Sequence, residues 1–336
     1  MSAIVISDLT KRMGKKRLFS NLNLEVLEGE AFALLALDNC GKTTLSRILF
    51  NYLKPAKGRI TIFDLDCVKD SKTIKESVGF VPEKLALQEN LKASTLFKYT
   101  LSAHNFKNTE QLNYLIEYFD FNQRLRIVDM TDREKKLFSI INALIVKPRL
   151  IILDEPIKDL EEEDKVKLFT LLNKLKQDEN LTIFMLTNSL VDAQKYCDRA
   201  AFLNEGEIIG VEFLKDKISN DKLVKIYTPV HNITPLQNIG AVLIYDKIDS
   251  KHFYFDKDMR DLSDVIANMR IDNYTIEDAS LDDKLSALEN KVKFDNTNNN
   301  INENRVAENT ISNTEVIEPI NSETVDDTVV IKEEVQ

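Results

Sequence analysis

Short apolar runs and stretches of helical spacing alternate through the first two thirds of the chain. Apolar runs bounded by turns are typical of buried strands, and apolar residues at every third or fourth position are typical of helices. The apolar runs include 31–37, 150–153 and 181–186, and helical spacing covers 92–128, 133–146, 163–177 and 189–196. This alternation predicts an α/β fold with a mostly parallel sheet and a ligand at the carboxyl ends of its strands.

Shorter strand-like segments flank these elements, and the pattern changes after Asp221. The early segments are 3–7, 22–26, 57–63, 77–82, 200–203 and 208–209. The later ones are strand-like at 223–227, 241–245 and 253–255, helix-like at 262–269, and a strand–helix pair at 274–288. We therefore predict a first domain over 1–218 and a small α+β accessory domain over 219–290.

The last segment, 291–336, is rich in Asn, Glu, Thr and Ser. It holds ten acidic and four basic residues, so it carries −6 of the formal net charge of −10. A polar segment with this excess charge cannot bury a core, and we predict a disordered acidic tail. Solubilising and partner-binding roles for it both stay open.

Composition narrows the class of protein. The chain of 336 residues is 43% hydrophobic and 30% charged, as expected for a globular protein. Its acidic balance and the lack of a basic cluster with interleaved aromatics argue against binding of nucleic acid. No apolar run approaches the roughly 18 residues needed to cross a bilayer. The three scattered cysteines, Cys40, Cys67 and Cys197, suit a reducing compartment. We expect a cytoplasmic protein whose membrane role, if any, comes through a partner.

The stretch 31–49, AFALLALDNCGKTTLSRIL, has the layout of a phosphate-binding loop between a strand and a helix. Such loops direct backbone N–H groups and a helix N-terminus at phosphate, with a lysine for the terminal phosphates and a hydroxyl for Mg²⁺. The expected residues are Asp38, Asn39, Cys40, Gly41, Lys42, Thr43 and Thr44. Ala36 replaces the first glycine of the motif, which would cost roughly 1–2 kcal/mol if its backbone were left-handed.

A second candidate segment supplies carboxylates. The apolar run 150–153 leads directly into Asp154-Glu155-Pro156. In a nucleotide site of this kind, Asp154 would hold Mg²⁺ and Glu155 would act as general base toward the attacking water. Together the two segments predict binding of a nucleotide with Mg²⁺.

With these residues in view, the chain resembles the ATP-binding cassette (ABC) family over about residues 3–215. The resemblance rests on the order and spacing of Leu9-Thr-Lys, Glu28-Gly-Glu, the phosphate loop, Lys57-Gly-Arg-Ile, Val78-Gly-Phe-Val-Pro, Ala143-Leu, Leu150–Pro156, Cys197-Asp-Arg and Asn204–Ile209. It implies a P-loop NTPase core with an antiparallel β edge and a helical subdomain at about 90–145. The segment after Asp221 resembles the C-terminal extension of exporter subunits.

The resemblance also assigns site residues, several of which depart from the family. Met13 stands where an aromatic ring stacks on adenine, and Glu83 stands where a glutamine contacts Mg²⁺. Asn188 replaces the histidine that contacts the γ-phosphate, and Glu161 replaces an aspartate. Asparagine donates a hydrogen bond but, unlike histidine, cannot take up a proton.

The family signature, Leu-Ser-Gly-Gly-Gln, reads here as Met130-Thr131-Asp132-Arg133-Glu134. In the family it contacts the nucleotide of the other subunit in a dimer, and Thr131 keeps the hydroxyl. Asp132 would place a carboxylate about 5 Å from phosphate, costing about 3 kcal/mol at an effective dielectric near 20. Arg133 is expected to offset part of that repulsion.

Three functions stay open at this point. The first is the ATP-binding subunit of an ABC exporter, working with a transmembrane permease and a second nucleotide-binding subunit at the inner face of the membrane. The second is a pseudo-ATPase that binds ATP as a regulatory or structural subunit, as the departures at Met13, Asp132 and Asn188 suggest. The third is a cassette of translation or DNA repair, which would need a second cassette or a long coiled coil.

Overall fold

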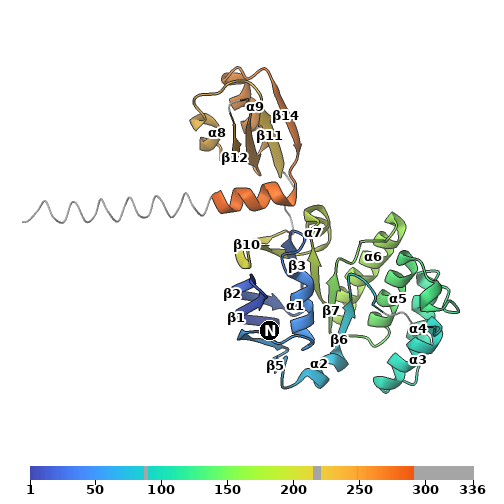
Figure 1. Cartoon of the computed structure of the whole chain (residues 1–336). Helices are drawn as coiled ribbons and strands as arrows, with labels where there is room; N and C mark the ends of the chain where they lie inside the picture. Colours follow the sequence, from blue (N-terminus) through green and yellow to red (C-terminus); the bar gives the residue numbers. More distant parts are fainter. Residues whose placement is uncertain (87–89, 215–220, 248, 291–336) are drawn as a thin grey trace, which may run out of the picture. The chain divides into compact units, whose positions relative to one another are not determined.

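A computed structural model describes residues 1–86, 90–214, 221–247 and 249–290 (Figure 1). Residues Met1–Lys291 form one compact unit. The expected boundary near residue 218 and the expected acidic tail, 291–336, lie outside the described residues. Within the described ranges, no helix combines the length and the apolar character needed to cross a bilayer.

The chain begins with an antiparallel sheet in the order β2-β1-β4-β5. Its strands are β1 (Ser2–Met13), β2 (Lys16–Leu27), β4 (Lys57–Ile62) and β5 (Leu65–Asp66). The first two form a hairpin much longer than the expected segments 3–7 and 22–26. Charged residues near the turn hide this extension in the sequence pattern, and Gly14 with φ of 59° allows the tight turn.

The central sheet has the order β10-β9-β3-β8-β7-β6. Its strands are β3 (Ala31–Ala36), β6 (Val78–Val81), β7 (Leu150–Asp154), β8 (Thr182–Thr187), β9 (Arg199–Asn204) and β10 (Glu207–Phe213). All neighbouring pairs are parallel except β9 with β10. Every residue of β3, β7 and β8 is buried, as parallel strands covered on both faces require. The predicted α/β core with a mostly parallel sheet is confirmed.

Helices cover this sheet: α1 (Lys42–Leu49), α2 (Ser71–Ser77), α3 (Ala93–Ala103), α4 (Glu110–Tyr118), α5 (Asp132–Leu144), α6 (Glu162–Glu179) and α7 (Leu190–Tyr196), with a 3₁₀ turn η1 (Ile127–Asp129). The helical stretch expected over 92–128 is divided into α3 and α4. Asn105 and Asp120 take left-handed conformations just beyond the ends of these two helices. Asparagine and aspartate tolerate that conformation better than most residues, which explains the breaks.

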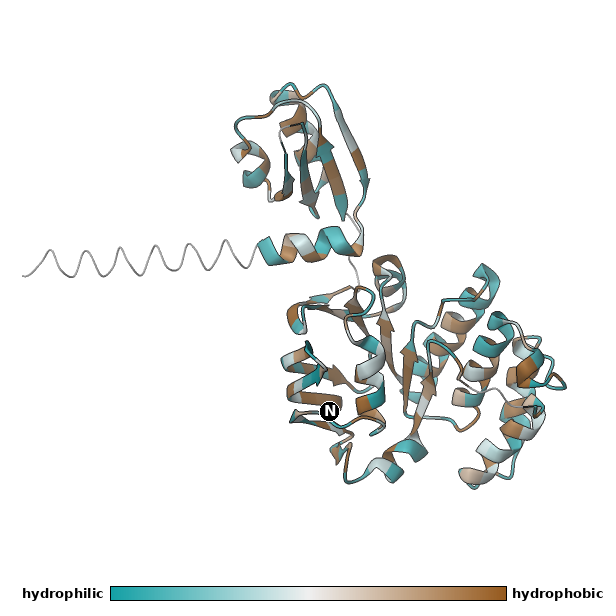
Figure 2. Ribbon diagram, in the orientation of Figure 1, coloured by the Kyte–Doolittle hydropathy of each residue, from teal (hydrophilic) through white to brown (hydrophobic). Residues whose placement is uncertain are grey.

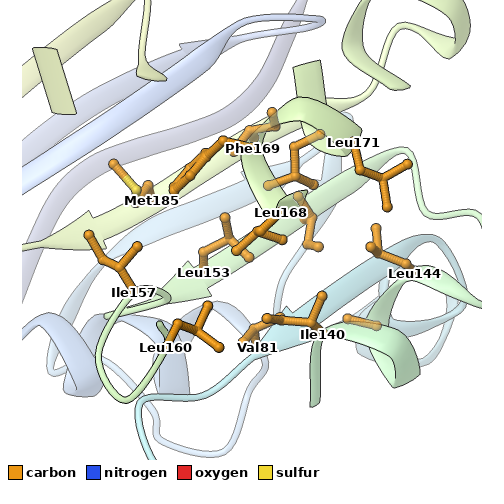
Figure 3. Close-up of a cluster of buried hydrophobic side chains, with 14 of the residues drawn as sticks. Val81, Ile140, Leu144, Leu153, Ile157, Leu160, Leu168, Phe169, Leu171 and Met185 are labelled. Carbon is orange, nitrogen blue, oxygen red and sulfur yellow. The ribbon is translucent and has the colours of Figure 1, made fainter. Parts of the chain in front are cut away.

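Two hydrophobic clusters hold these elements together, and the larger one positions the end of β7. Figure 2 shows the strands of the central sheet largely in brown and the outer surfaces of the helices in teal. Figure 3 shows part of the larger cluster, in which Leu153 of β7 and Met185 of β8 pack in the same group as Leu168 of α6 and Ile140 of α5. Because Leu153, Leu168 and Ile140 are fully buried, the residue after Leu153 is fixed where β7 ends.

A third sheet follows residue 221, in the order β12-β13-β11-β14. Its strands are β11 (Lys222–Ile226), β12 (Val242–Asp246), β13 (Lys251–Phe255) and β14 (Tyr274–Asp278), and its helices are α8 (Thr234–Asn238), α9 (Met259–Asn268) and a helix over 281–290. It has its own hydrophobic cluster, which includes Val224, Phe253 and Leu262. The separate accessory domain remains a prediction, because Leu281 and Leu285 join the larger cluster of the first 214 residues.

A buried ionic cluster also joins the two parts of this unit. The Lys284 ammonium, 1% exposed, lies 3.0 Å from Glu212 Oε2 and 3.1 Å from Asp221 Oδ1. Tyr254 and Gln194 donate further hydrogen bonds to the Asp221 carboxylate. The Lys284 ammonium holds the pKa of Asp221 below its usual value although burial acts in the opposite direction.

Candidate functional site

The loop between β3 and α1 has the geometry of a phosphate-binding loop. Asn39 and Gly41 take left-handed conformations, with φ of 62° and 99°. A Cβ atom on Gly41 would lie 3.0 Å from the ring of Phe19, and the left-handed backbone would strain a larger residue at this position. Ala36 is the last residue of β3 and has no left-handed backbone. The condition stated for Ala36 is therefore not met, and the strain does not arise.

The Lys42 side chain is buried at the first residue of α1. Its ammonium donates to the Ala36 carbonyl at 2.6 Å and lies 3.0 Å from Glu155 Oε1. It is also 3.9 Å from Asp38 Oδ1. The contact with Glu155 brings together the two candidate segments, which are more than a hundred residues apart in the sequence.

Asp154, at the end of β7, is fully buried. Its carboxylate accepts hydrogen bonds from Thr43 and from Ser46, the latter at 3.3 Å. Burial raises the pKa of Asp154 to about 6, against the effect of these hydrogen bonds. Its Oδ1 atom is buried and has no hydrogen-bond partner in the structure. A hard cation such as Mg²⁺ takes oxygen ligands of this kind, so Asp154 and Thr43 fit the expected metal.

Glu155 follows in a left-handed conformation, with φ of 45°. Its amide donates to the Leu186 carbonyl at 2.9 Å, which ties it to the neighbouring strand β8. Its side chain is nearly buried, and Oε2 accepts from the Thr187 hydroxyl at 3.4 Å. A left-handed glutamate is strained, and such strain concentrates at functional sites.

These residues line a pocket of about 570 Å³ that is open on one side. Its lining is Met13, Lys16, Leu18, Asp38, Asn39, Gly41, Lys42, Thr43, Thr44, Glu83, Glu155 and Lys158. Cavities of about 970 and 760 Å³ lie elsewhere and contain none of these residues. We take the smaller pocket as the functional one, because it joins the phosphate loop to the carboxylates.

The other residues expected at this pocket differ in how they contact it. Met13 is half-exposed, and its sulfur lies 3.8 Å from the Thr44 hydroxyl. Asn188 donates to Asp38 at 3.1 Å, so its amide reaches the phosphate loop. The Cys40 side chain packs against the smaller hydrophobic cluster instead of lining the pocket. Any contribution of Cys40 to phosphate binding therefore comes from its backbone.

Two lysines at this site were missed by the sequence analysis. Lys158 lies in the turn after β7, and its ammonium is 2.8 Å from Glu83 Oε1. This contact lowers the pKa of Glu83. Lys136 of α5 is buried and donates to three backbone carbonyls, those of Pro82, Glu83 and Glu155. Burial lowers the pKa of Lys136 to about 8.

The signature segment lies outside this pocket, at the start of α5. Thr131 caps the helix and forms a reciprocal capping box with Glu134, whose Oε2 accepts from the Thr131 hydroxyl at 2.9 Å. The Arg133 guanidinium donates to Asp164 at 2.6 and 2.9 Å. This pair engages Nε and one terminal nitrogen of Arg133, and the expected offset of the Asp132 charge stays a prediction.

We expect Arg133→Ala to lower the free energy of unfolding by about 2 kcal/mol, because it leaves the Asp164 carboxylate buried without its cation. Asp164 lies in the first turn of α6, where the helix dipole retains part of the stabilisation. Urea denaturation measures the change. Arg126→Ala is the control, since Arg126 forms an exposed pair with Asp129. Equal losses in the two variants would argue against the Arg133–Asp164 pair as the source of the stability.

Comparisons with known proteins agree with this geometry. The family model described as ABC transporter matches residues 19–158. The chain is 28% identical over 223 residues to the bacitracin transport ATP-binding protein BcrA of Bacillus licheniformis, covering 62% of this chain and 69% of that one. It is 25% identical to the Nod factor export ATP-binding protein I of Rhizobium etli, covering 68% and 74%. It is 23% identical to the Fe(3+) ions import ATP-binding protein FbpC of Fusobacterium nucleatum, covering 85% and 78%.

A solved structure shares the fold. The dimeric structure of the ATP-binding cassette MJ0796 in a post-hydrolysis state, bound to ADP and Pi, aligns with a TM-score of 0.58 at 20% identity. The alignment covers 63% of this chain and 99% of that one.

Proposed function

Because this chain belongs to the ABC transporter family as an ATP-binding subunit, we propose that it binds ATP with Mg²⁺ in the 570 Å³ pocket. A separate transmembrane subunit would convert that binding into transport. The observation that carries the proposal is the buried Oδ1 of Asp154, which has no hydrogen-bond partner and lies beside the phosphate loop.

Each part of the pocket has a role in this proposal. The backbone N–H groups of Gly41, Thr43 and Thr44 would bind phosphate at the start of α1. Thr43 and Asp154 would hold Mg²⁺, which supplies positive charge to the β- and γ-phosphate oxygens. Met13, beside Thr44, would contact the adenine through its thioether.

The Lys42–Glu155 pair supports a sequence of events on binding. In the structure the two side chains neutralise each other at 3.0 Å. A triphosphate attracts the Lys42 ammonium more strongly than one carboxylate does, so Lys42 would turn to the phosphates. Glu155 would then be free to accept a proton from the attacking water, which is the role of a general base. Asn188 would donate to the γ-phosphate once it leaves Asp38.

The proposal includes a second nucleotide-binding subunit, identical or different. Thr131 lies outside this chain's own pocket, so its hydroxyl would serve a nucleotide held by that subunit. To do so it would give up its bond with Glu134, and Asp132 would add negative charge beside the phosphate. In a dimer of different subunits the site completed by Met130–Glu134 is therefore expected to be the weaker one, and in a dimer of identical subunits both sites would carry this defect.

A second candidate function is ATP binding without turnover, as a regulatory or structural subunit. The observation that favours it is that two groups expected to act on the γ-phosphate, those of Thr131 and Asn188, are poorly suited to that role. The Thr131 hydroxyl is engaged in a capping box, and the Asn188 amide has no ionisable proton to hold near the phosphate.

Glu155→Gln in the complex assembled with its membrane subunit separates the two functions. We expect the rate of phosphate release to fall about a hundredfold or more while ATP binding is retained, as loss of a key catalytic group predicts. Radiolabelled ATP binding and phosphate release are measured on the same preparation. Lys42→Ala is the control that loses binding. An unchanged rate for Glu155→Gln, with the second subunit's sites inactivated, would support binding without turnover.

We propose export as the direction of transport, with the subunit at the inner face of the membrane through its permease. The support is the similarity to the Nod factor export ATP-binding protein I. Because another relative is an iron import protein, the direction of transport needs a test of its own. In inverted membrane vesicles an exporter carries its substrate inward when ATP is added outside, and an importer does not.

A further inference from the structure

One cation in the pocket has no part in the function proposed above. Lys158 lies in the turn between β7 and α6, with Ile157 and Leu160 on either side nearly buried. These two apolar anchors fix the turn, so the half-exposed Lys158 side chain lies at the pocket beside Glu83. We propose that Lys158 is a nucleotide-binding residue that contacts the terminal phosphate of a nucleoside triphosphate. The inference rests on the proposed binding of ATP.

The charges of the pocket are the first argument. Its lining includes three carboxylates, Asp38, Glu83 and Glu155, and Asp154 lies behind them. Lys42 neutralises Glu155, and Lys16 donates to the Asn39 carbonyl at 3.0 Å. Glu83 would therefore repel a polyanionic ligand if it stood alone. Its pairing with Lys158 at 2.8 Å removes that repulsion and brings a positive charge to the pocket.

The contacts of Lys158 indicate which phosphate it would meet. The pocket residues fall into two groups: Met13 contacts Thr44, whereas Lys158 contacts Glu83. Lys42 and Glu155 belong with the second group through Lys136, which donates to the carbonyls of both Glu83 and Glu155. If the base lies beside Met13, the far end of the triphosphate lies beside the carboxylates and Lys158.

Hydrogen bonds fix the backbone around the Lys158–Glu83 pair, whereas the Lys158 ammonium can move. Lys136 holds the carbonyl of Glu83, and the Lys158 amide donates to the Glu155 carbonyl at 3.4 Å. The Lys158 side chain is 50% exposed, and that of Glu83 is 31% exposed. The ammonium can therefore exchange the carboxylate for phosphate by side-chain rotation alone. An exposed pair of this kind is weak and is readily exchanged.

The test compares affinities for Mg·ATP and Mg·ADP by calorimetry on the full chain. We expect Lys158→Met to weaken ATP binding about tenfold and ADP binding less than twofold, because only ATP has the third phosphate. Lys158→Arg should keep most of the preference for ATP. The double variant Lys158→Met/Glu83→Gln should recover only part of the ATP affinity, because it removes the charge of Glu83 without restoring the contact between Lys158 and phosphate. Full recovery would overturn that contact. Lys167→Met is the control, since its ammonium pairs with Glu163 on α6.

Two further results would overturn the inference while leaving ATP binding in place. In the first, Lys158→Met weakens ATP and ADP equally. In the second, it changes neither affinity, which would make the pair with Glu83 a surface salt bridge only. If the unchanged chain binds neither nucleotide, the proposed function fails together with this inference. Thermal unfolding of each variant establishes that a lost affinity does not come from a lost fold.

Discussion

Replacing Lys284 by methionine is expected to lower the free energy of unfolding by about 3–5 kcal/mol, the range for removing one partner of a buried ion pair. The Lys284 side chain is 1% exposed and its ammonium faces the carboxylates of Asp221 and Glu212, whose side chains are 4% and 20% exposed. Methionine fills a similar volume but removes the cation that faces the buried Asp221 carboxylate, which keeps the hydrogen bonds donated by Tyr254 and Gln194.

Urea denaturation of the full chain measures this loss, and two further variants test its cause. Lys225→Met removes an ammonium from a partly exposed pair with Glu277 in the third sheet. It should lower the free energy of unfolding by less than about 1 kcal/mol. Lys284→Met/Asp221→Asn should be less destabilised than Lys284→Met alone, because the buried charge has been removed. A double variant that shows the sum of the two single losses would argue against the ion pair as the source of the stability.

Lys136→Met is the second substitution with a large expected effect, a loss of about 3 kcal/mol in the free energy of unfolding. The Lys136 ammonium donates to three carbonyls, of which that of Glu155 also accepts from the Lys158 amide at 3.4 Å. The part-buried carbonyls of Pro82 and Glu83 would lose this donor, at about 1–3 kcal/mol for each acceptor left without one. Relief of the buried charge of Lys136 returns part of that sum. The three carbonyls belong to the ends of β6 and β7, which carry Glu83 and Glu155.

The neighbouring residue provides a matched control for this substitution. Lys135 lies on the same helix and forms only a long, exposed pair with Asp132 at 3.8 Å, so Lys135→Met should change stability by less than about 0.5 kcal/mol. We further expect Lys136→Met to weaken ATP binding at temperatures where the chain is still folded, because it frees the backbone that positions Glu83 and Glu155. Normal ATP affinity in a destabilised Lys136→Met would limit its role to the fold.

The two segments that carry the proposed ATP site could be predicted because each is continuous in the sequence. An apolar strand followed by Gly41-Lys42-Thr43, and another followed by Asp154-Glu155, place polar groups at strand ends that a parallel sheet brings together. Periodicity and motif spacing are sufficient for that step. The predicted strands 31–37 and 150–153 agree with β3 and β7 to within a residue at each end.

The rest of the site depends on contacts that no local pattern records. Lys136 meets Pro82 from 54 positions away, and Lys158 meets Glu83 from 75 positions away. In the sequence both are single lysines near charged neighbours, which is the usual appearance of a solvated surface. The partner of Arg133 could not be predicted for the same reason, since Asp164 is 31 positions away. The one available signal was the change from the family glutamine to Glu83, which requires a compensating cation.

The pairing of β3 has a consequence for how the chain is made. Both neighbours of this strand, β8 and β9, come from residues 182–204, about 150 positions later. During synthesis the β1–β2 hairpin can form early. The fully apolar β3 has no partner strand on either edge until about residue 204 has left the ribosome. Open apolar edges invite pairing with other chains. Fragments that stop before β8 should therefore aggregate, and a nascent chain at this stage is where a chaperone would have most to protect.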